Sequence, residues 1–88
     1  MELEGERAYR RKLASAVARR LPQHEFAIHE LMERRECFRD MCEELLAAEM
    51  ALSRVADVPL LQREARRSEW QACVERSLGE IEAEVRKR

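Results

Sequence analysis

Apolar residues recur at helical spacing along most of the chain, and the longest such stripe lies between residues 22 and 55. Its members stand seven positions apart, with a second set three positions later: Leu31, Phe38, Met41, Leu45, Ala48, Leu52 and Val55. Residues at this spacing share one face of an α-helix, so that face must be buried against another apolar surface. The pattern predicts one long helix over residues 22–55.

A second stripe follows Pro59 and consists of Val74, Leu78, Ile81 and Val85. It predicts a returning helix over residues 59–85. The connection between the two stripes is short, and short connections favour antiparallel neighbours. We therefore expect a long, coiled-coil-like antiparallel helical hairpin, preceded by an amphipathic helix over residues 6–20.

Two prolines mark the predicted boundaries. Leu21 precedes Pro22, and a residue before proline is pushed away from the helical conformation. Pro22 suits the first turn of a new helix. At the second boundary Asp57 is a residue type that caps helices, and Pro59 suits the opening turn of the last helix.

A charged patch at residues 33–36 interrupts the long stripe for about one turn and could mark a kink. Because no glycine or proline stands there, we predict that the helix continues through it. Folding the chain back about residues 57 and 58 places Arg35 opposite Glu80. The same register brings Glu49 close to residues 66–67.

Composition supports a single all-α domain over residues 1–88. Charged residues make up 40% of the chain, which holds two glycines and two prolines, a composition typical of long helices. The stripes are too extended for one hairpin to bury, so we predict a homo-oligomer, either a dimer or a larger helical bundle. Its core and contacts are expected to use Phe26, Leu31, Phe38, Met41, Leu45, Leu52, Trp70, Val74, Leu78, Ile81 and Val85.

One run of residues resembles a known family. Leu21-Pro22-Gln23-His24-Glu25, then Ile28-His29-Glu30-Leu31 and Phe38, is similar to the pattern of the small bacterial YdcH-like helical-hairpin proteins. The resemblance covers residues 21–85. The chain departs from that pattern at residues 35–37, where members often have a helix break, and at residues 77–81. The resemblance implies a helical hairpin and supplies no activity.

The histidines do not form a metal site by spacing. His24 and His29 are five residues apart and point to different sides of a helix. His29 and Glu33 could supply two ligands, whereas a closed site needs three or four. We predict no metal ion and no other cofactor.

The three cysteines are predicted to be reduced. Cys37 and Cys42 are five residues apart and point to different sides, while Cys42 falls within the apolar stripe. Cys73 stands opposite Cys42 in the predicted register, so a redox bridge is an open alternative to ordinary packing. A thiol or metal sensor is accordingly the lowest of three hypotheses for function.

The first predicted helix carries six basic side chains and no acidic one between residues 7 and 20. We expect this helix to pack on the hairpin or on a neighbouring subunit. As an alternative, its basic face could contact nucleic acid or an anionic membrane surface. The residues concerned are Arg7, Arg10, Arg11, Lys12, Arg19 and Arg20.

The sequence indicates no enzyme. Its many carboxylates fit a solvated helix face, and no nucleophile–base pair or phosphate-binding glycine loop is present. Seventeen basic and eighteen acidic residues leave a net charge of -1, which disfavours nucleic acid as a partner of the whole chain. Short apolar runs and the absence of a leader favour a soluble, cytoplasmic protein. We predict a non-enzymatic helical interaction module that binds itself or another helical protein and takes no small-molecule substrate.

Overall fold

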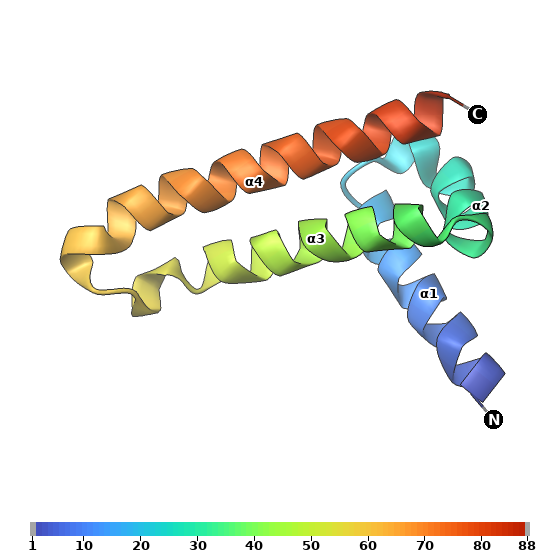
Figure 1. The fold of residues 1–88 in the computed structure, drawn as a ribbon, viewed down its shortest axis with the longest axis horizontal. Coiled ribbons are helices and arrows are strands. Elements are labelled where there is room, and N and C mark those ends of the chain that lie inside the picture. The colour runs from blue at the N-terminus through green and yellow to red at the C-terminus, as the bar shows by residue number, and fades with distance from the viewer. Residues whose placement is uncertain (1, 88) are drawn as a thin grey trace.

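The computed structural model describes residues 2–87, and within them no strand occurs. The all-α prediction is confirmed. Four α-helices and two short 3₁₀ turns follow one another in the chain (Figure 1). They are α1 (Glu2–Ala18), η1 (Pro22–His24), α2 (Glu25–Arg34), α3 (Glu36–Ser53), η2 (Val55–Asp57) and α4 (Leu60–Arg86).

Helix α1 begins four residues earlier than predicted and packs across α2 and α3. It ends at Ala18, and Leu21 has a non-helical backbone with φ −133° and ψ 63°. The chain then makes the η1 turn, which Pro22 opens. The proline boundary therefore lies where the sequence predicts it.

The prediction of an unbroken helix over residues 22–55 is wrong. Arg35 adopts an extended conformation, with φ −129° and ψ 117°, and separates α2 from α3. No glycine or proline is needed, because packing overrides local helix propensity. The break turns α2 away from the axis of α3 (Figure 1), and Ile28, Met32 and Phe38 all reach the same core.

The second connection differs from the prediction in its cap. Pro59 occupies the N-cap position of α4, and Asp57 belongs to η2 and caps nothing. Arg63 from the first turn of α4 closes the loop instead. Its Nη2 donates to the carbonyl oxygens of Ala56 at 2.9 Å and Val58 at 3.0 Å.

Helices α3 and α4 lie side by side and run in opposite directions (Figure 1). Their register differs by one helical turn from the predicted one, since Arg35 Nη1 lies 3.1 Å from the carboxylate of Glu84 rather than near Glu80. The η2 turn and the two residues after it lengthen the connection, which moves opposing positions along α4. Glu49 pairs with Arg20, which follows α1, instead of with residues 66–67.

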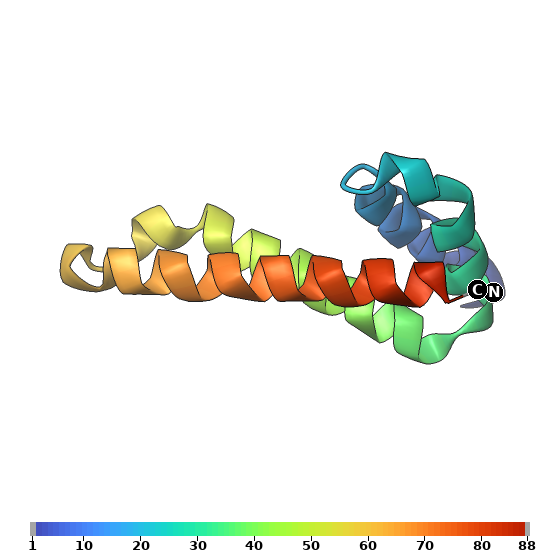
Figure 2. The ribbon, with the colours of Figure 1, turned by 90° about the horizontal axis from the view of Figure 1, so that it is seen from above.

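The hydrophobic core lies at one end of the molecule. There α1 and α2 cover the first half of α3 and the second half of α4 (Figure 2). Its largest fully buried side chains are Phe38, Ile28, Met32, Leu45, Ile81, Val17 and Cys42, whereas Val55 is buried outside this cluster, in η2. The other half of the α3–α4 pair extends beyond this core without a third helix.

Candidate interaction surfaces

The residues predicted to carry association fall into three groups. Five of them, Leu31, Phe38, Leu45, Ile81 and Val85, are buried inside this single chain. Four more are half-buried: Met41, Leu52, Val74 and Leu78. The remaining two, Phe26 and Trp70, are exposed. The stripe therefore serves largely as an internal core, because α1 and α2 cover it.

The uncovered part of the α3–α4 pair is here called the distal arm, comprising residues 50–70. Large apolar side chains face solvent on it. Leu61 is 98% exposed, Leu60 is 74% exposed, and Met50 and Trp70 are also exposed. Of these four, only Trp70 belongs to the set that the stripes single out. Met50, Leu60 and Leu61 stand outside both stripes, so periodicity does not mark them.

The inward positions of α4 change character along the helix. Ile81 and Val85 are buried at the core end, whereas Arg63 and Arg67 take half-buried positions in the distal arm. Arginine stems cover apolar surface poorly compared with leucine, although their methylenes do contribute. The distal arm thus has a thin interior of its own.

Charges on the distal part of α4 are paired along the helix. Arg66 lies 2.9 Å from Glu69, and Arg67 lies 3.5 Å from Glu64. Both pairs are exposed and are worth at most about 1 kcal/mol each. Their effect is to place both signs of charge beside the exposed leucines.

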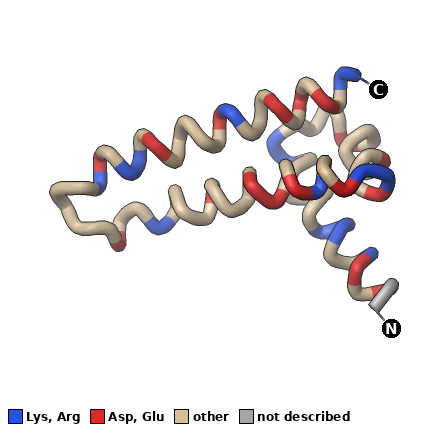
Figure 3. Tube along the Cα trace, in the orientation of Figure 1, with Lys and Arg blue, Asp and Glu red and all other residues tan. Residues whose placement is uncertain are grey.

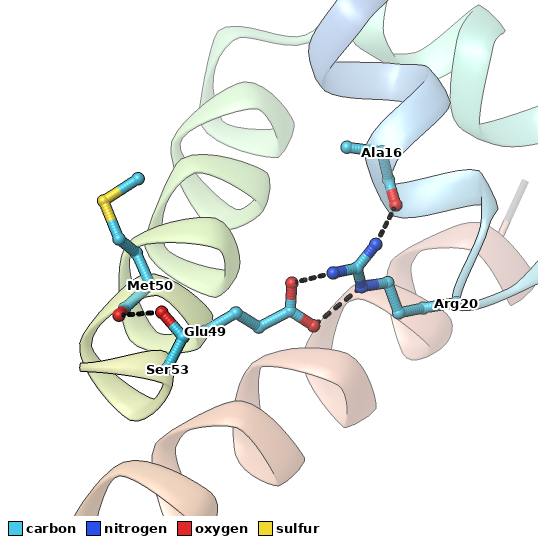
Figure 4. Close-up of polar contacts among 5 residues, drawn as sticks. All are labelled: Ala16, Arg20, Glu49, Met50 and Ser53. Carbon is cyan, nitrogen blue, oxygen red and sulfur yellow. Dashed lines mark hydrogen bonds and ion pairs between the residues drawn. The ribbon is translucent and has the colours of Figure 1, made fainter. Parts of the chain in front are cut away.

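Two of the six basic residues between residues 7 and 20 are neutralised within the chain. Arg10 lies 3.0 Å from Glu33 of α2 and 3.8 Å from Glu6. Arg20, just beyond α1, holds Glu49 of α3 through two N–H groups and donates from Nη1 to the Ala16 carbonyl at 2.9 Å (Figure 4). These two arginines fasten α1 to the rest of the fold.

The other four cations of this segment behave differently. Arg7, Arg11, Lys12 and Arg19 are exposed, and none forms an ion pair or side-chain hydrogen bond with any residue from 4 to 87. The last three line an open depression on the outer side of α1 together with Ala8 and Ser15. Figure 3 shows basic segments along α1 and acidic ones on the first turns of α3.

A wider cleft separates the first half of α1 from the first half of α3. Side chains of both signs line it, including Arg10, Arg39 and Asp40. At its edge the Tyr9 hydroxyl donates to the Glu43 carboxylate. This hydrogen bond, with smaller effects from burial and from the negative charge of Glu43, raises the pKa of Tyr9 above 10.0.

No disulfide joins the three cysteines of the described residues, and His24 faces a carboxylate. His24 Nε2 lies 3.6 Å from the carboxylate of Glu82. Cys37 is exposed, Cys73 is half-buried and Cys42 is fully buried. Burial, helped by the nearby Glu43 carboxylate, raises the pKa of the Cys42 thiol to about 12. A thiol in that state is a poor nucleophile at neutral pH.

Two broader searches of the described residues are negative. Residues 4–87 bring together no group of three histidine, cysteine or acidic side chains that could hold a metal ion. Across residues 2–87, no helix has both the length and the apolar character that crossing a bilayer requires.

Comparisons of the chain with protein-family models, with curated proteins and with solved structures give no match. The resemblance to YdcH-like proteins therefore stays a prediction. Function has to be argued from the surfaces of this molecule alone.

Proposed function

We propose that this protein is a non-enzymatic helical interaction module that self-associates through its distal arm. One observation carries the proposal: the α3–α4 pair extends beyond the cover of α1 and α2, with Leu61 almost fully in solvent and Leu60 largely exposed. Apolar side chains gathered on an exposed element favour association, since their burial contributes roughly 1.5–3 kcal/mol per large residue.

A second copy of the same chain is the occupant that fits the arm. Two antiparallel helices bury little surface, and adding two more gives the common four-helix arrangement with a closed core. Arg66 and Glu69 put opposite charges on one short stretch of α4. A two-fold interface brings each surface patch against its own copy, so a patch carrying both signs can complement itself.

The proposal differs from the sequence-based one in the residues that make the contacts. Phe38, Leu45 and Ile81 are buried inside one chain and would leave their core only if the fold opened. Contacts between copies are therefore assigned to Met50, Leu60, Leu61 and Trp70, with the half-buried Leu52 beside them. We expect a coiled-coil-like bundle formed by two distal arms.

The proposal of a non-enzymatic role is supported by the shape of the clefts. The cleft between α1 and α3 is open to solvent and lined by charges of both signs. Acid–base catalysis depends on partly desolvated groups with tuned pKa values, and an open cleft supplies neither water exclusion nor a fixed geometry. We place the protein in the cytoplasm, where its three free cysteines would stay reduced.

The decisive experiment is absolute mass by size-exclusion chromatography with light scattering, over a dilution series with and without reductant. The expected result is a mass that is a multiple of 10.4 kDa and does not depend on reductant. A double variant, Leu60→Glu with Leu61→Glu, should shift the protein to a monomer while its far-UV circular dichroism stays helical.

A matched control tests whether the distal arm is specific. Phe26 on α2 is 76% exposed but lies at the core end of the molecule, so Phe26→Glu should leave the mass unchanged. A wild-type monomer at high micromolar concentration would refute self-association. If only the Phe26→Glu control lost the oligomer, the interface would lie at the core end of the molecule and the distal-arm proposal would be refuted.

A further inference from the structure

The outer side of α1 gathers cations that the fold does not use. Arg11, Lys12 and Arg19, with Ala8 and Ser15, line one open depression on this helix. Positions 8, 11, 12 and 15 fall on one side of α1, and Arg19 follows the last residue of that helix, with its N–H still bonded to the Ser15 carbonyl. This side, here called the basic face, is opposite to the side of α1 that packs into the core.

The charge on the basic face is local, although Lys12 also borders a second depression that Glu43 lines. The three cations of the face form no ion pair with any side chain in residues 4–87, whereas Arg10 and Arg20 on the same segment are both neutralised. Glu6 is the acidic residue closest to these cations along α1, and its carboxylate lies 3.8 Å from Arg10. The net charge of -1 for the whole chain thus hides a cationic strip.

We propose that the basic face binds the phosphodiester backbone of nucleic acid. Arginine guanidinium groups match phosphate oxygens with two parallel N–H donors, and lysine adds a third positive charge. Ser15 offers a hydroxyl of the kind that donates to backbone phosphates. All the polar groups of the face are therefore donors suited to one anion.

The dimensions agree with this ligand. Arg11 and Arg19 are eight residues apart, which corresponds to about 12 Å along a helix. One strand of duplex DNA presents a phosphate about every 3.4 Å along its axis, so roughly three phosphates face such a span. Three cations on the face can each neutralise one of them.

Membranes and acidic proteins fit the face less well. A helix that lies on a membrane needs large apolar residues beside its cations, and the apolar side chains Leu13 and Val17 of α1 are buried in the core. A protein interface gains most of its energy from buried aromatic or apolar anchors. Ala8 is the single apolar residue lining the depression. Three cations with no large apolar side chain among them favour backbone phosphate contact.

This binding is independent of self-association through the distal arm, which lies at the other end of the molecule. We expect it to be independent of base sequence, because the face holds no group placed to read base edges. Affinity should fall as salt rises. Three phosphate contacts predict roughly a 40-fold loss between about 50 and about 200 mM salt, from 0.9 counterions per contact.

The test is fluorescence anisotropy of a labelled DNA duplex of about two helical turns, titrated with the full chain at several salt concentrations. The triple variant Arg11→Gln, Lys12→Gln, Arg19→Gln should make the negative slope of log affinity against log salt shallower by about 2.7. The single variant Arg19→Gln should make it shallower by about 0.9. The single variant keeps the test valid if the triple variant folds poorly.

A charge-matched control separates the basic face from overall charge. Arg34, Arg76 and Arg86 are exposed cations on α2 and α4 outside the distal arm, and replacing all three by glutamine removes the same charge. The control should retain the wild-type slope. Equal loss in both triple variants would overturn the proposal, as would absence of wild-type binding at about 50 mM salt. Binding to phosphatidylglycerol vesicles without binding to the duplex would also overturn it.

Discussion

Phe38 and Phe26 give the sharpest test of the fold, because the sequence assigns both to one role and the structure separates them. Phe38 is 1% exposed in the core, and Phe26 is 76% exposed on α2. Truncating a buried phenylalanine to alanine removes its transfer free energy and leaves a cavity, at a cost of about 3–5 kcal/mol. Truncating an exposed one is expected to cost under about 1 kcal/mol.

The difference is large compared with the stability of the whole domain. At 0.05–0.15 kcal/mol per residue, a chain of 88 residues has a free energy of unfolding of about 4–13 kcal/mol. Phe38→Ala should therefore remove between about a quarter and nearly all of this free energy of unfolding. Phe38→Leu keeps much of the volume and should cost less than Phe38→Ala, which leaves a measurable transition.

The assay is urea unfolding followed by far-UV circular dichroism, repeated at several protein concentrations. Repetition is needed because self-association makes apparent stability depend on concentration. Equal losses for Phe38→Ala and Phe26→Ala would refute the placement of α2 and α3 around one core. A loss under about 1 kcal/mol for Phe38→Ala would refute the burial of that ring.

Three further predictions concern charge and titration. A double-mutant cycle on Arg20 and Glu49 should give a coupling near 1 kcal/mol that shrinks in high salt, since the pair is bidentate but partly exposed. A coupling indistinguishable from zero at low salt would contradict it. Tyr9 is the single tyrosine, and its pKa, read from tyrosinate absorbance, should fall toward 10.0 in Glu43→Gln. The Tyr9–Glu43 hydrogen bond stabilises the folded protein below pH 10, and this stabilisation is lost as the pH rises through the higher pKa of Tyr9 in the folded state. A Tyr9 pKa that is unchanged in Glu43→Gln would exclude Glu43 as the cause of the shift. Cys42 should react with a thiol reagent at neutral pH only on unfolding, while the other two cysteines react in the folded protein. Three equally fast thiols would contradict its burial.

Local signals in the sequence predict a large part of the fold. Apolar spacing gives the all-α class, and Pro22 and Pro59 mark the two ends of helices to within a few residues. Both signals act over one or two turns of chain, so a single sequence contains them. The break at Arg35 has no such signal, because it results from the packing of α2 onto a core made by distant segments.

The surfaces could be predicted less well for the same reason. Whether Arg10 and Arg20 are free depends on Glu33 and Glu49, which lie 23 and 29 positions further along the chain. The six basic residues therefore look alike in the sequence, whereas the fold separates two that form ion pairs from four that do not. The apolar pattern does not single out Leu61, because this residue lies outside both stripes. Leu61 is exposed because α1 and α2 do not extend as far as the distal arm.

The core joins residues from near both ends of the chain, which has a consequence for synthesis. Leu13 and Val17 of α1 share one cluster with Ile81 and Val85 of α4. At 5–20 residues per second, a ribosome needs about 4–14 s to travel from the first of these to the last. Throughout that interval α1 has no complete surface on which to fold. We therefore expect a nascent chain that stays open to chaperones until α4 has emerged.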